Sequence, residues 1–130
     1  MSLQRFIEAQ QGDYARALAE IRAGRKASHW MWYIFPQLRG LGRSGMAERY
    51  GIEDLVEARG FLADPVLGPR LIGITRALLA HEGAEAVDIF GSVDALKLRS
   101  CATLFEAAGG SEVVGEVLSR FFGGNQCSLT

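Results

Sequence analysis

The stretch Ser28-His-Trp-Met-Trp-Tyr-Ile-Phe35 contains both tryptophans of the chain and its densest run of large apolar side chains. Aromatic rings bury large areas, so we expect two or three of these rings to fill the core. Pro36 ends the run, because the residue before a proline avoids helical angles. We predict a short helix over 29–35 with Ser28 as its N-cap. A strand is the alternative, because aromatic and β-branched residues favour strands. The buried face of the helix would consist of Trp30, Tyr33 and Ile34.

Apolar residues at helical spacing continue on both sides of this stretch. One helix opens at Leu3, and a second, capped by Asp13, ends at Gly24. The pair Asp64-Pro65 is typical of a cap followed by a first-turn proline. The further predicted helices cover residues 44–50, 53–63, 64–81, 85–90, 92–107 and 111–122, with Leu96 among the buried residues. No alternating strand appears elsewhere. The pattern predicts one all-α domain over residues 1–130, an orthogonal bundle of about seven or eight short helices.

Composition narrows the class of protein. The chain has 130 residues, of which 48% are hydrophobic, as in a globular domain. No apolar run is long enough for a bilayer, and no secretory signal is visible. With two cysteines, we expect free thiols and a cytoplasmic location without membrane contact. An isoelectric point near 6.1 makes a general nucleic-acid binder unlikely.

Charge is unevenly distributed. The segment from Ile21 to Ala47 contains no Asp or Glu, although the whole chain has a net charge of −1. The same segment contains both tryptophans, His29 and five basic residues, namely Arg22, Arg25, Lys26, Arg39 and Arg43. This pattern indicates a positive, aromatic-rich surface on which an anion bearing a ring could bind.

The loop Gly40-Leu-Gly-Arg-Ser-Gly45 has the spelling of the dinucleotide fingerprint G-x-G-x-x-G. That fingerprint requires a preceding strand and a parallel βαβ unit, and neither is predicted here. A weaker interpretation remains, in which the loop and the helix start at Ser44 offer backbone N–H groups to a phosphate or carboxylate, and Arg43 adds a guanidinium. The alternative is a tight turn that needs glycine angles and binds nothing.

Three other positions have both a functional and a structural interpretation. His29 beside guanidinium groups could act as a general base, or it could be a packed, hydrogen-bonded histidine. An exposed Trp32 near Arg25 or Arg43 could stack on a base or an adenine-like ring. A late helical face could form an anion pocket, or it could be an ordinary polar face; it consists of Lys97, Ser100 and Thr103. We find no catalytic triad, metal-ligand spacing or carboxylate pair.

Four segments resemble a known family: Gly24-Arg-Lys-Ala-Ser-His-Trp-Met-Trp-Tyr-Ile-Phe-Pro-Gln37, Gly40-Leu-Gly-Arg-Ser44, Asp64-Pro-Val-Leu-Gly68 and Lys97-Leu-Arg-Ser-Cys-Ala-Thr-Leu-Phe105. They are similar to a bacterial domain of unknown function, number 1810, sometimes labelled calpastatin-like. The resemblance implies a small, mainly helical cytoplasmic protein. It implies no established activity, so it transfers no catalytic residue. The chain departs from the family pattern at Cys101 and Ala102, where Ser and Met are usual.

The leading hypothesis is that the chain binds, with or without turnover, a small anionic nucleotide or ADP-ribose-like ligand, without metal or cofactor. The predicted binding residues are Arg25, Lys26, His29, Trp32, Arg43, Ser44, Lys97, Ser100 and Thr103. The catalytic residue is unknown, and His29 is the candidate. The alternative is a protein-interaction module, monomer or homodimer, with Trp32 as an interface anchor.

Overall fold

The computed structural model describes residues 3–41, 44–110, 112–128 and 130. Within them the chain forms seven helices: α1 (Gln4–Arg22), α2 (Met31–Ile34), α3 (Gly45–Arg49), α4 (Leu55–Ala63), α5 (Leu67–Leu79), α6 (Ala86–Ala107) and α7 (Glu112–Phe122). The described residues contain no strand, and their one isolated bridge joins Leu38 and Ile52. The all-α prediction is confirmed. None of the described helices has the length and apolarity needed to cross a membrane.

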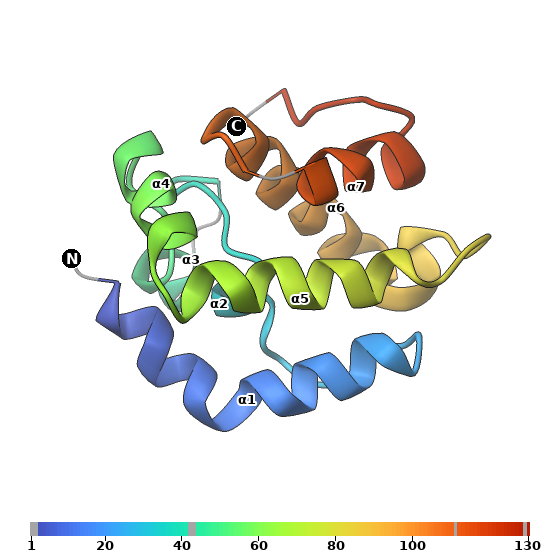
Figure 1. Cartoon of the computed structure of the whole chain (residues 1–130), viewed down its shortest axis with the longest axis horizontal. Coiled ribbons are helices and arrows are strands. Elements are labelled where there is room, and N and C mark those ends of the chain that lie inside the picture. The colour runs from blue at the N-terminus through green and yellow to red at the C-terminus, as the bar shows by residue number, and fades with distance from the viewer. Residues whose placement is uncertain (1–2, 42–43, 111, 129) are drawn as a thin grey trace.

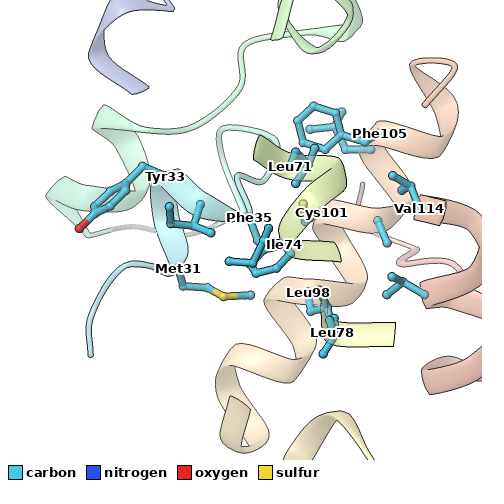
Figure 2. Close-up of a cluster of buried hydrophobic side chains, with 14 of the residues drawn as sticks. Met31, Tyr33, Phe35, Leu71, Ile74, Leu78, Leu98, Cys101, Phe105 and Val114 are labelled. Atoms are coloured by element: carbon cyan, nitrogen blue, oxygen red, sulfur yellow. The ribbon is translucent and has the colours of Figure 1, made fainter. Parts of the chain in front are cut away.

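Helix α5 crosses the middle of the molecule, between α1 on one side and α6 and α7 on the other (Figure 1). Helices α2, α3 and α4 lie together at one end (Figure 1). Buried apolar side chains from these elements form one cluster. Figure 2 shows residues of the α2 segment, α5, α6 and α7 meeting in it, with Phe35, Ile74 and Leu98 near its centre.

The tryptophan-rich stretch fills the core as predicted, but its helix is shorter. Trp30 is fully buried, and Tyr33 and Ile34 are also buried. Helix α2 covers Met31–Ile34 rather than 29–35, and its N-cap residue is Trp30, which makes no side-chain cap. The predicted cap at Ser28 is wrong because the Ser28 hydroxyl donates instead to Glu20, at 2.7 Å.

Helix α1 corrects a second prediction. It is one helix that continues through Asp13, where we expected a new helix to begin. The Asp13 carboxylate is not a cap, because it accepts a hydrogen bond from the Tyr33 hydroxyl and lies 3.6 Å from Arg16. The predicted end is confirmed, since Gly24 follows the helix with a φ of 81°.

Helix α5 covers Leu67–Leu79 rather than 64–81, and its N-cap residue is Val66 instead of the predicted Asp64. Asp64 still holds the turn before the helix, because its Oδ1 accepts from the backbone N–H groups of Val66 and Leu67 at 2.8 and 3.0 Å. Gly91, with a φ of 80°, separates a short N-terminal part of α6 from a long one, as predicted. Leu96, however, is 63% exposed rather than buried. The inward face of α6 is instead formed by residues at helical spacing, namely Ala95, Leu98, Ala102 and Phe105.

Candidate functional site

A pocket of about 430 Å³ opens between the segment after α2 and the long part of α6. This volume is within the range of about 300–1,000 Å³ that is typical of small-molecule sites. We call it the Trp32–Lys97 pocket. Its lining residues are Trp32, Gln37, Leu41, Ser44, Ala47, Val93, Leu96, Lys97, Ser100 and Cys127.

The pocket brings together four of the predicted site residues, which are Trp32, Ser44, Lys97 and Ser100. Lys97 Nζ lies 4.9 Å from the centroid of the Trp32 ring, within cation–π distance. Trp32 is partly buried, so it presents only part of its indole to solvent. The late helix therefore packs against the tryptophan-rich stretch and combines an ammonium group with an aromatic face.

Asp94 sets the charge of this site. Its carboxylate lies 2.9 Å from Lys26 Nζ and 3.2 Å from Lys97 Nζ, so it bridges the two ammonium groups. Lys26 does not line the pocket. Its side chain is only 9% exposed, and its ammonium also donates to the Ser28 carbonyl at 2.5 Å and lies 5.1 Å from the Trp30 ring. Lys26, Asp94 and Lys97 together carry one net positive charge.

The other predicted site residues are elsewhere. Arg25 and His29 are exposed, and neither lines the pocket. Thr103 lines a different, smaller pocket of about 160 Å³. Its hydroxyl donates to the Arg99 carbonyl at 2.8 Å and accepts from the Cys127 N–H at 2.9 Å. Arg43 lies outside the described residues.

The two serine hydroxyls in the pocket already have partners. Ser44 Oγ accepts from the Ala47 N–H at 3.1 Å and so caps α3, a helix of five residues. Ser100 Oγ lies 2.8 Å from the Thr130 hydroxyl, within hydrogen-bond distance. Because a hydroxyl that accepts one hydrogen bond can still donate its own proton, Ser44 remains a possible donor. The lining side chains that carry hydrogen-bond donors thus include Lys97, Gln37, Trp32 and Ser44.

Glu20 is a structural residue that the sequence analysis did not identify. Its carboxylate accepts from the Ala27 N–H at 2.6 Å, from Ser28 through both its N–H and its hydroxyl, and from the Trp30 indole at 3.0 Å. Desolvation raises the pKa of Glu20, but these hydrogen bonds outweigh it and lower the pKa to about 2. The acid-free segment is thus held by an acid one residue before it.

The segment after α7 supplies one wall of the pocket at Cys127. Contacts with α6 hold it there: Arg99 donates to the Gln126 carbonyl at 2.9 Å, the Gln126 amide donates to Glu106 at 2.9 Å, and the Cys127 N–H donates to Thr103. No sequence signal predicted this wall. Val93 and Leu96 lie one turn apart on α6. The sequence analysis expected Leu96 to be buried and therefore did not place it at a surface pocket.

A family model described as "Protein of unknown function (DUF1810)" matches residues 1–130. The chain belongs to the DUF1810 family. The resemblance seen in the four sequence segments is therefore confirmed. Among solved structures, this chain is similar to the conserved hypothetical protein Rv1873 from Mycobacterium tuberculosis, with a TM-score of 0.96 and 44% identity over 98% of this chain and 92% of that one. A comparison with curated proteins gives no match.

Proposed function

We propose that this DUF1810 protein binds a small organic anion in the Trp32–Lys97 pocket. The observation that supports this most directly is the position of Lys97 Nζ, 4.9 Å from the Trp32 ring in a space of about 430 Å³. An aromatic face can stack on a planar group while an ammonium pairs with its charge. Mononucleotides and ADP-ribose-like compounds, the predicted ligand class, combine both features.

The proposal is for binding and assigns no catalytic residue. His29, the candidate base, is exposed and does not line the pocket. A base must reach the proton that it removes, at about 3 Å or through one water. The geometry therefore gives no support to a hydrolase that uses His29.

A ligand panel with matched variants tests the proposal. Nucleotides, sugar phosphates and aromatic acids are titrated by calorimetry, which measures affinity equally well in a variant that lacks Trp32. Any compound that binds in the pocket should lose about tenfold in affinity with Lys97→Gln or Trp32→Leu, equivalent to roughly 1.4 kcal/mol. Arg25→Gln, which removes an exposed charge outside the pocket, should leave the affinity unchanged.

Alkylation of Cys127 reports whether a ligand binds in the pocket. It lines the pocket, whereas Cys101 is buried, so alkylation by iodoacetamide should occur at Cys127. Burial raises the pKa of the Cys101 thiol, which further suppresses its reaction. A bound ligand should slow the alkylation of Cys127. If no compound in the panel does so, and none binds in a Lys97-dependent way, the proposal is wrong.

One observation favours the alternative of a protein-interaction module. Val93 and Leu96 are 67% and 63% exposed and lie side by side on α6. Exposed apolar neighbours are common in protein interfaces. If this were their role, light scattering should show an assembly that grows with concentration and is lost in Leu96→Glu. A protein that is monomeric at every concentration would argue against self-association.

A further inference from the structure

We infer that the ligand of the Trp32–Lys97 pocket is a monoanion carried on a flat apolar body, such as an aromatic carboxylate or sulfonate. This inference rests on the proposed function and narrows it, because nucleotides with several phosphate charges would be excluded. Three features of the pocket support it: its charge, its hydrogen-bond donors and its apolar wall.

The charge of the described lining residues matches one negative charge. Lys97 is the single charged side chain among them, and the Asp94 carboxylate, 3.2 Å from Lys97 Nζ, partly neutralises it. The attraction between ligand and site grows in proportion to the ligand charge, whereas the cost of removing the ligand from water grows faster. Lys97 therefore compensates a monoanion, whereas a dianion would bring a second charge for which the described lining residues offer no partner.

The hydrogen-bond donors of the lining match one small anionic group. The lining side chains that carry donors include Lys97, Gln37, Trp32 and Ser44, whose hydroxyl accepts from the Ala47 N–H and keeps its own proton. A carboxylate has two oxygens with about four acceptor positions, which these donors can largely satisfy. A di- or triphosphate would bury many more acceptor oxygens than these donors can reach.

The rest of the wall is apolar. Besides Trp32, the lining includes the apolar side chains of Leu41, Val93 and Leu96. Val93 and Leu96 are two of only five large apolar side chains that are strongly exposed among the described residues. Both line the same pocket. A ligand with an apolar body would cover Val93 and Leu96 and remove them from water, which is favourable.

A matched set of probes tests the inference. At pH 8, 2-naphthalenesulfonate carries one negative charge and 2-naphthyl phosphate carries about two, since the second phosphate pKa is about 6. Both have the same ring and a tetrahedral headgroup, and 2-naphthalenesulfonamide serves as the neutral control. Calorimetry should show the sulfonate binding at least about tenfold more tightly than either of the others. The sulfonate should also protect Cys127 from alkylation.

Two variants locate the effect. Lys97→Gln should weaken the sulfonate about tenfold, to the level of the sulfonamide. Asp94→Asn should shift the preference toward the phosphate by roughly threefold, because it removes one negative charge beside Lys97. The comparison of the three probes on the unaltered protein decides the question even if Asp94→Asn does not fold.

The outcomes separate the two proposals. If 2-naphthyl phosphate or AMP binds as tightly as the sulfonate and loses affinity in Lys97→Gln, the monoanion inference is overturned and the proposed function stands. If no probe protects Cys127 or depends on Lys97, both are overturned. Sulfonate binding that exceeds phosphate binding and requires Lys97 supports both.

Discussion

Single carboxylates organise the basic segment of this protein. Glu20 accepts four hydrogen bonds from residues Ala27, Ser28 and Trp30, and Asp94 bridges Lys26 and Lys97. Both acids lie outside the acid-free segment. Asp94 pairs two ammonium groups that would otherwise repel, whereas Glu20 fixes the backbone and the Trp30 indole of the segment.

Glu20 should make stability depend on pH. Its pKa is about 2 in the folded protein, below its ordinary value of 4.5, so its contribution is fully present above about pH 4.5 and is lost as the pH falls toward 2. Because the carboxylate is partly exposed, we expect a loss of about 1–2 kcal/mol. Urea unfolding at pH 7, 5 and 3 should show a steeper fall for the unaltered protein than for Glu20→Gln.

Glu8→Gln, on the exposed face of α1, makes the same change of charge and serves as the control for the Glu20 measurement. It should retain the pH dependence of the unaltered protein. Equal slopes for Glu20→Gln and the unaltered protein would contradict the role assigned to Glu20.

At the scale of elements, the approach of α4 to α5 is fixed by Gly68. The chain turns sharply between the two helices. The Asp64 side chain accepts from the Val66 and Leu67 N–H groups, and its backbone carbonyl accepts from the Gly68 N–H at 3.1 Å. A Cβ atom at position 68 would overlap the Leu62 carbonyl, which belongs to α4. The glycine is therefore required by the close approach of two backbones rather than by its φ angle.

Two glycines in helices should respond in opposite directions to the same substitution. Gly68→Ala should lower the free energy of unfolding by about 2–3 kcal/mol, because the backbone of α4 must move. Gly12→Ala should raise it by up to about 1 kcal/mol, because a Cβ atom there meets nothing within 4 Å and alanine favours the helix. Thermal unfolding of both variants measures the difference. A stable Gly68→Ala protein would show that the helices can separate without cost.

At the scale of the whole molecule, the core and the pocket lie on different faces of α6. Phe105 is fully buried, and its ring centroid lies 5.2 Å from that of Phe61 on α4 (Figure 2 shows Phe105 at the edge of the cluster). Leu96, on the same helix, is exposed and lines the pocket. One helix thus contributes separately to stability and to the proposed site.

Substitutions on the two faces should separate these contributions. Phe105→Ala should cost about 3–5 kcal/mol of stability, because it leaves a cavity in the core. Leu96→Ala should change stability by less than about 0.5 kcal/mol while weakening any ligand of the pocket. Denaturant unfolding and ligand titration on both proteins make the comparison. A Leu96→Ala protein that unfolds as easily as Phe105→Ala would contradict the assignment of the two faces.

Local signals were enough for much of the fold. The end of α1 at Gly24, the break at Gly91 and the burial of Trp30 were all predicted. Each depends on backbone angles or hydrogen bonds between near neighbours, or on an apolar area too large to leave in water. Two wrong predictions, the caps at Ser28 and Asp13, involve side chains whose partners lie in another segment: Ser28 bonds Glu20 of α1, and Asp13 accepts from Tyr33 of α2.

The site was predicted only in part, and for a physical reason. The sequence by itself determined a helical protein of the DUF1810 family with a basic, aromatic segment, because composition, periodicity and motifs are properties of neighbouring residues. Only the tertiary structure decided which cations meet the tryptophans. Lys97 reaches Trp32 because α6 packs against the segment after α2, while Arg25 remains exposed in solvent. A contact between side chains of two helices depends on how the helices pack, and the pattern of neighbouring residues in the sequence does not encode that packing.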